Sequence, residues 1–432
     1  MQQILPKNTG KDRKKILFFR VLFFTIHFPG PGKAREPKMK RADDPGRISG
    51  MGKEFYTAGT ERARKLQLRF IENGPFQEYP VSDKLRREKF CRRERRIFTV
   101  MKRLTTLLMI LVMTLCSACL PALGEAAETA ETAPVIPYRY ATAEEGREMM
   151  LANTEYFDSI TLNKIGFVMH DPEATTEVYK AFAGQQVLEW TDAEKELIDR
   201  CMAVVEASFA DHGWKMPPLE TVVFIRTTML EEGGAFGYTH GTQIYLSGML
   251  EQYATLAPEQ IDEPIAQLLA HELFHCLTRC NPDFRKDMYS IIHFTVDEEE
   301  YEFPASVAEY YIANPDVEKH NAHATFLIDG RETECYTAYI TTKHCENEAE
   351  SFMDFGVTAL VPTDGSDVWY RADQASNFNE VFGTNTGYVI DPEECMADNF
   401  SYAVIFGEKG PEGNGYPNPE IISAIGRYLA GE

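Results

Sequence analysis

His271-Glu272-Leu273-Phe274-His275 stands inside a segment, about Pro258 to Arg279, that predicts one long helix. Histidines at positions i and i+4 lie one turn apart and about 40° around the helix axis, so both imidazoles can reach one metal ion. Glu272 lies beside them, where its carboxylate can take a proton from a water molecule at the metal. Leu268 and Leu269 in the preceding turn indicate that the helix is buried. The alternative is a pair of core histidines beside a capping or solvated glutamate.

A zinc ion in such a site needs a third protein ligand. The segment Asp391-Pro392-Glu393-Glu394 begins a second predicted helix, on which Glu394 and Asp398 share one face. We expect Glu394 to bind the metal and Asp398 to hydrogen-bond the far nitrogen of a ligand histidine. The alternative is that Glu394 only completes a capping box behind Asp391. Glu309 is the best substitute as third ligand.

The chain has 432 residues, of which 44% are hydrophobic and 25% charged, as expected of a globular protein. Residues 1–100 carry 25 Lys and Arg against 11 Asp and Glu, whereas residues 101–432 carry 19 against 55. Residues 1–100 are therefore either an upstream extension that is not expressed or a basic cytoplasmic tail. The net charge of −36 over residues 101–432 argues against nucleic acid or an anionic membrane surface as the target.

Residues 101–124 have the layout of a secretory signal peptide, with basic residues, an apolar stretch and then small residues. Cys116-Ser117-Ala118-Cys119 resembles the lipobox of bacterial lipoproteins, so Cys119 is a candidate for lipidation, and cleavage after Gly124 is the alternative. Residues 125–137 predict a flexible linker. We expect a protein secreted by a bacterium or held at its surface, with a lipid on Cys119 as the only membrane anchor. The six cysteines beyond the signal predict either disulfides or buried free thiols.

Residues 138–432 predict one α+β domain, because strands precede helices without a repeating βαβ pattern. A capping box at Thr191 begins a helix that ends near Asp211. Asp329-Gly330 predicts a hairpin between two strands. The other predicted elements are strands at 221–225 and 242–246 and helices near 258–279, from Pro392 onward, and 419–429.

With these residues the sequence resembles the gluzincins, metallopeptidases defined by HExxH and a downstream glutamate, and looks closest to small secreted bacterial members. The resemblance covers most of residues 190–430 and is most specific in Pro392-Glu393-Glu394 and Ala397-Asp398-Asn399-Phe400. It implies a zincin-like fold, with a small mixed β-sheet over the HExxH helix and a mostly helical C-terminal part. It implies Zn2+ bound by His271, His275 and Glu394, with Glu272 as general base. The NExxSD and GxMEN signatures are absent, which leaves exopeptidase and endopeptidase both open.

The activity that the resemblance implies is hydrolysis of peptide bonds in a polypeptide or peptide, and we expect a monomer. Tyr388 is the first candidate to donate a hydrogen bond to the developing oxyanion, and His240 is the second. If Tyr238 to Leu246 borders the cleft as an edge strand, an extended peptide could pair with it. Two other functions stay open: a catalytically silent surface lipoprotein that binds a partner, and an amide hydrolase acting on cell-wall peptide.

Overall fold

The computed structural model describes residues 135–432. The predicted upstream extension, the signal peptide with Cys119 and most of the predicted linker lie outside the described residues. Ile136 is already buried in the core, and its backbone N–H donates to Glu206 Oε1 at 2.8 Å. The folded unit therefore begins two residues before the predicted boundary. Among residues 135–432, no helix combines the length and apolar character that a membrane span requires.

The first β-sheet is mixed and has both faces covered. Its strands are β1 (Tyr138–Tyr140), β2 (Val187–Leu188), β3 (Val222–Thr227), β4 (Gly237–His240) and β5 (Gln243–Ser247). The order is β1-β3-β5-β4, with β2 beside β3; β1 and β5 run parallel to β3, and β4 runs antiparallel to β5. Along β3, Val222 and Phe224 face one core, and Val223 and Ile225 face the other. In this order β4 is the last strand on its side of the sheet, so it is an edge strand.

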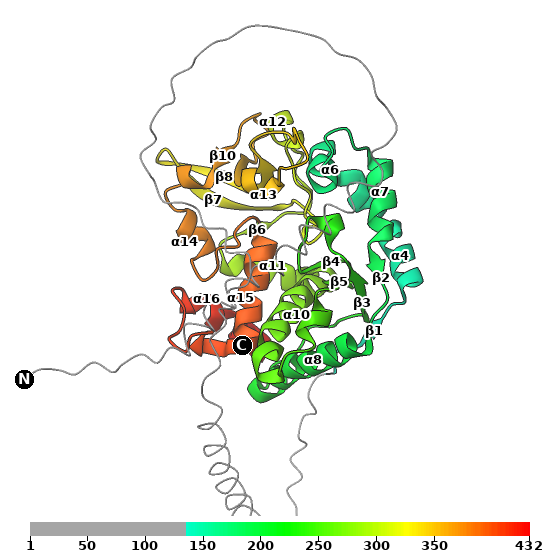
Figure 1. Ribbon diagram of the computed structural model, residues 1–432. Helices are drawn as coiled ribbons and strands as arrows, with labels where there is room; N and C mark the ends of the chain where they lie inside the picture. The colour runs from blue at the N-terminus through cyan, green and yellow to red at the C-terminus, as the bar shows by residue number, and fades with distance from the viewer. Residues whose placement is uncertain (1–134) are drawn as a thin grey trace, which may run out of the picture. The chain divides into compact units, whose positions relative to one another are not determined.

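Two long helices pack on one face of this sheet, and four shorter ones cover the other (Figure 1). The long helices are α8 (Asp192–His212) and α10 (Pro258–Cys280). The shorter ones are α4 (Ala143–Ala152), α5 (Thr154–Ser159), α6 (Leu162–Met169) and α7 (Thr176–Gln185), none of which was predicted. Helix α8 begins with the predicted capping box, formed by Thr191 and Glu194. Gly213, with φ +63, ends it in the left-handed conformation.

A second β-sheet, antiparallel throughout, follows in sequence. Its strands are β6 (Thr295–Val296), β7 (Ala322–Ile328), β8 (Arg331–Thr341), β9 (Gly356–Pro362) and β10 (Tyr370–Arg371), in the order β10-β9-β8-β7-β6. The predicted hairpin joins β7 and β8, and its turn residues Asp329 and Gly330 have φ values of 52 and 74. The α+β class is confirmed, but the prediction of one small sheet is incomplete.

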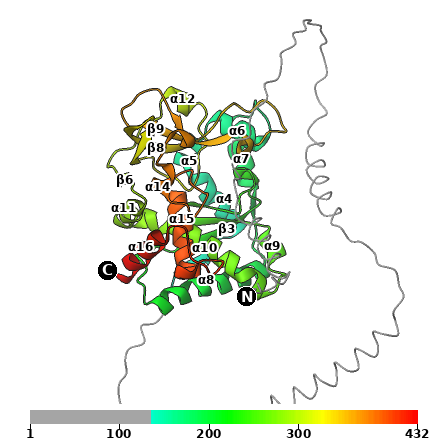
Figure 2. The same ribbon diagram turned by 90° about the vertical axis from the view of Figure 1, so that its left-hand side faces the viewer.

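The C-terminal part brings helix α15 (Pro392–Phe406) against α10, as the two views agree (Figure 2). Phe274 on α10 meets Phe400 on α15 with ring centroids 5.4 Å apart. Helix α10 is buried on all sides over most of its length, as the apolar turn before His271 predicts. The remaining α-helices of residues 135–432 are short: α9 (Leu250–Tyr253), α11 (Pro282–Ile291), α12 (Ala305–Ala308), α13 (Phe352–Phe355), α14 (Phe378–Phe382) and α16 (Pro419–Ala430).

The six cysteines within residues 135–432 are free thiols, and all except the half-buried Cys280 are buried. The structure therefore has the buried thiols that were one of the two alternatives.

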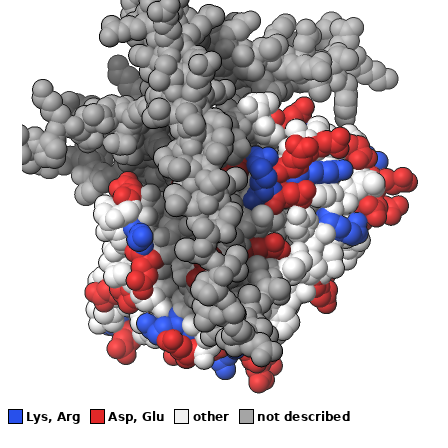
Figure 3. Space-filling view, turned by 90° about the horizontal axis from the view of Figure 1, so that it is seen from below, with Lys and Arg blue, Asp and Glu red and all other residues white. Residues whose placement is uncertain are grey.

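On the surface seen in Figure 3, Asp and Glu side chains are spread over the visible described residues, with Lys and Arg between them.

Candidate metal centre

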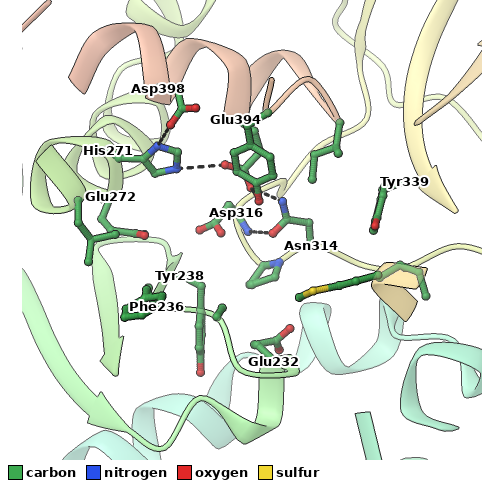
Figure 4. Close-up of a pocket in the computed structure, with 18 of the residues that line it drawn as sticks. Glu232, Phe236, Tyr238, His271, Glu272, Asn314, Asp316, Tyr339, Glu394 and Asp398 are labelled. Carbon is green, nitrogen blue, oxygen red and sulfur yellow. Dashed lines mark hydrogen bonds and ion pairs between the residues drawn. The ribbon is translucent and has the colours of Figure 1, made fainter. Parts of the chain in front are cut away.

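Helices α10 and α15 bring the three predicted metal ligands together. His271 Nε2 lies 3.1 Å from Glu394 Oε2, and His275 Nε2 lies 3.7 Å from the same oxygen. All three side chains are buried, and one ligand atom from each lies within 4.8 Å of the others. Figure 4 shows His271 reaching from its helix toward Glu394, with Asp398 above the imidazole and joined to its other nitrogen. Residues far apart in sequence therefore form one group that could hold a metal ion.

Two observations show that the nitrogen and oxygen atoms of these three side chains fit a metal ion. His275 Nε2 is fully buried and has no hydrogen-bond partner among the described residues, an arrangement that costs free energy unless something binds the nitrogen. Ligand atoms around a tetrahedral zinc ion lie about 3.4 Å apart. The two distances to Glu394 Oε2, 3.1 and 3.7 Å, are close to that separation. The arrangement of His271, His275 and Glu394 is thus that of a two-histidine, one-carboxylate centre.

Both histidines are oriented by carboxylates on α15. His271 Nδ1 lies 2.9 Å from Asp398 Oδ1, which is the predicted contact. His275 Nδ1 lies 3.0 Å from Glu393 Oε1, a contact that was not predicted. Glu393 also accepts a hydrogen bond from the Tyr289 hydroxyl at 2.5 Å. With Nδ1 of each ring held by a carboxylate, Nε2 of each ring is directed to the shared point.

Glu394 is held by its other oxygen. Its Oε1 accepts hydrogen bonds from the Asn314 amide and, at 2.9 Å, from the Tyr388 hydroxyl. The helix N-terminus is capped without it, because Asp391 Oδ1 accepts from the backbone N–H of Glu393 at 2.9 Å. The capping-box alternative for Glu394 is therefore not what the structure shows, and its Oε2 is left to face the histidines.

The electrostatics of the group favour a cation. Burial opposes a charge on His271, but hydrogen bonds from its ring to Asp398 and Glu394 raise its pKa well above the usual value. Burial likewise opposes a charge on Glu394, yet the contact with His271 lowers the pKa of its carboxyl to about 2. These buried carboxylates stabilise positive charge at the point where the three ligand atoms meet.

Glu272, the predicted general base, lies between α10 and the edge strand. Its Oε2 accepts a hydrogen bond from Thr239 Oγ1 at 2.8 Å. A Cβ on Gly237 would lie 2.5 Å from Glu272 Oε1, so only glycine leaves room for the carboxylate here. Burial raises the pKa of Glu272, the direction that suits a group exchanging protons near neutral pH.

His271, Glu272, Glu394 and Asp398 line a cavity of about 550 Å³ beside the edge strand. Its walls include Phe236, Tyr238, Ile312, Tyr339 and Phe352. Mostly apolar walls with a few convergent polar groups are typical of ligand sites in proteins.

Two predicted alternatives lie elsewhere in the structure. Glu309 is exposed and pairs with His344 at 3.0 Å, so it does not substitute as a ligand. His240 is buried against Tyr156, with ring centroids 4.6 Å apart, and it does not line the cavity. Tyr388 does line the cavity and contacts Glu394, so it is the better placed of the two oxyanion candidates.

Comparisons with protein-family models, with curated proteins and with solved structures found no match to this chain.

Sequence reasoning missed four residues that build the site: Gly237, Asn314, Asp316 and Glu393. Glu393 stands in the string Pro392-Glu393-Glu394, and Asn314 begins the string Asn314-Pro315-Asp316, which also carries the resemblance. Neither string indicates which side chain turns inward. Asp316 lies on an irregular segment without periodicity. The only usable signal was the pair of glutamates at 393 and 394, because neighbours on a helix differ by about 100° and can serve two different histidines.

Proposed function

We propose that the chain is a zinc-dependent metallopeptidase with a zincin-like fold, secreted or attached to the bacterial surface. One observation carries the proposal: His271 Nε2, His275 Nε2 and Glu394 Oε2 converge in a buried site with Glu272 beside them. A zincin-like arrangement is further supported by the mixed sheet over α10, by the edge strand β4 along the cavity, and by the helical origin of Glu394.

Zinc, when bound by these three residues, would polarise the scissile carbonyl and lower the pKa of a water molecule. Glu272 would accept a proton from that water as it attacks, and would then deliver the proton to the leaving amine. Thr239 would orient the carboxylate through its hydroxyl, and Gly237 would leave the room that the carboxylate needs. The Tyr388 hydroxyl is the proposed donor to the developing oxyanion.

Glu272→Gln tests this function most directly, because the amide keeps the shape of the side chain but cannot accept the proton. Wild type should hydrolyse casein or short peptides, and the variant should lose about 100-fold or more in kcat with its zinc content unchanged. Glu309→Gln, an exposed glutamate outside the site, is the matched control and should keep full activity. A zinc-loaded wild type that binds peptides without hydrolysing them would contradict the proposal and favour a binding protein. If only cell-wall fragments are hydrolysed, the same zinc site would act on amide bonds of cell-wall peptide and not on those of polypeptides.

A further inference from the structure

The outer edge of strand β4 is open only over part of its length. Its inner edge pairs with β5, where Phe236 O also accepts the backbone N–H of Ser247 at 3.0 Å. On the outer edge, Thr239 N–H donates to Asp316 Oδ1 at 2.6 Å, and Gly241 N–H donates to Glu318 Oε1 at 2.9 Å. Two donors that an extended peptide would use are therefore already taken by side chains.

The segment that occupies this edge, residues 314–318, is fixed in place by α10. Arg279 donates to the carbonyl oxygens of Pro315 and Asp316 at 3.3 and 3.0 Å, and its Nε lies 2.7 Å from Glu318 Oε1. Asn314 at the start of the segment donates to Glu394. The segment is thus a wedge between the edge strand and the metal helix, attached to both.

The cavity ends at this wedge. Gly237 and Tyr238 line it, whereas Thr239, His240 and Gly241 do not. Its volume of about 550 Å³ is that of a small-ligand site. A peptide can therefore pair with the outer edge of β4 only as far as Gly237, because the wedge occupies the edge beyond it. The site thus suits the end of a peptide chain better than an internal segment.

The charges at the closed end indicate which end of a peptide enters. Asp316 lines the cavity there, with its Oδ1 4.0 Å from His275 Nε2, and together with Glu272 and His275 it forms a second buried group that could hold a cation. Lys164 is the one lysine or arginine in the lining, and its protons go to Tyr156, Glu232 and the carbonyl oxygen of Ala313. A terminal ammonium at the closed end could donate a charge-assisted hydrogen bond to Asp316, whereas a terminal carboxylate would find no free lysine or arginine proton in the lining.

We propose, on the basis of the proposed function, that the site removes the first residue from peptides that carry a free α-amine. Asp316 binds that amine. The apolar walls at Ile312, Tyr339 and Phe352 surround the side chain of the residue removed, which should be apolar. In the reaction, water adds to the first carbonyl carbon and the C–N bond breaks. The free amino acid leaves, and the shortened peptide receives its amine proton from Glu272.

The substrates for the test are a leucyl tripeptide with both ends free, its N-acetylated form, its C-terminal amide, and a long peptide blocked at both ends. With zinc-loaded wild type, acetylation should lower kcat/KM about 100-fold or more, and amidation should leave it unchanged. The long blocked peptide should stay intact. Equal cleavage of the acetylated tripeptide, or internal cleavage of the blocked peptide, would overturn the inference while upholding a peptidase. Hydrolysis of none of the four would overturn the inference and the proposed function together.

Asp316→Asn provides the second test, because the amide oxygen can still accept from Thr239 N–H while the charge is lost. Its kcat/KM on the free tripeptide should fall about 100-fold, chiefly through KM, with zinc content and melting temperature preserved. Asp367→Asn is the matched control, since the exposed Asp367 also accepts a backbone N–H, from Ser306 at 2.9 Å. Unchanged kinetics for Asp316→Asn would remove Asp316 from amine binding and overturn the proposal.

Discussion

Gly237→Ala should lower the proposed peptidase activity strongly without changing a metal ligand. The added Cβ would lie 2.5 Å from Glu272 Oε1 and 3.0 Å from its carboxyl carbon. To restore an ordinary contact of 3.4 Å, the oxygen must retreat by about 0.9 Å. A displacement of about 1 Å in a catalytic group costs on the order of 100-fold in rate, so kcat/KM should fall by about that factor. Alanine is compatible with the backbone at this position, because Gly237 is not among the glycines with positive φ.

The assay compares kcat/KM on a peptide that the wild type cleaves with zinc content measured on the same preparation. Zinc should stay at the wild-type level, because the three atoms nearest the added Cβ all belong to Glu272 and none belongs to a proposed metal ligand. Gly426→Ala is the control: this glycine also lacks a positive φ, and its new Cβ would meet only Trp214, at 3.3 Å. Wild-type activity in Gly237→Ala would refute the claim that activity depends on the position of the Glu272 carboxylate beside the edge strand.

Three further changes probe the surroundings of the centre. Asp398→Asn and Glu393→Gln should each weaken zinc affinity about 10- to 100-fold in a competition titration with a chelator, and unchanged affinity would show that these carboxylates do not orient the histidines. Tyr388→Phe should lower kcat about 100-fold at unchanged zinc affinity if its hydroxyl donates to the oxyanion, whereas a loss of zinc affinity would assign it to holding the third ligand. Lys164→Met leaves Glu232 buried without its cation and should lower the free energy of unfolding in urea by about 3–5 kcal/mol, and adding Glu232→Leu should recover most of that loss.

Local signals in the sequence predicted the elements that carry the site. Histidines four residues apart on an apolar helix predict their own convergence, because the helix alone determines their relative positions. The same holds for the cap at Asp391, which begins α15 where Asp391-Pro392 predicts. Glu394 lies 119 positions after His275, and no local pattern states that the two meet. The expectation came from the need of a zinc ion for a third ligand and from the helix predicted at Asp391, and the resemblance supported it. The packing of α15 along α10 brings the two residues together.

Other parts of the fold could not be predicted because they depend on long-range pairing. The second sheet has one tight turn with a sequence signal, at Asp329-Gly330, and its remaining strands are joined by longer connections. The wedge at residues 314–318 has no periodic pattern at all. Its contacts with β4 and α10 follow from tertiary structure, so the closed end of the cleft and the position of Asp316 were not predictable.

The most direct measurement is the zinc content of residues 125–432, wild type beside Glu394→Ala, after zinc supplementation and removal of excess metal. The predicted result is one zinc per wild-type chain, with zinc weakened or lost in Glu394→Ala and retained in the exposed control Glu309→Ala. A wild type that carries no zinc would contradict the centre itself, and full retention in Glu394→Ala would contradict Glu394 as its third ligand.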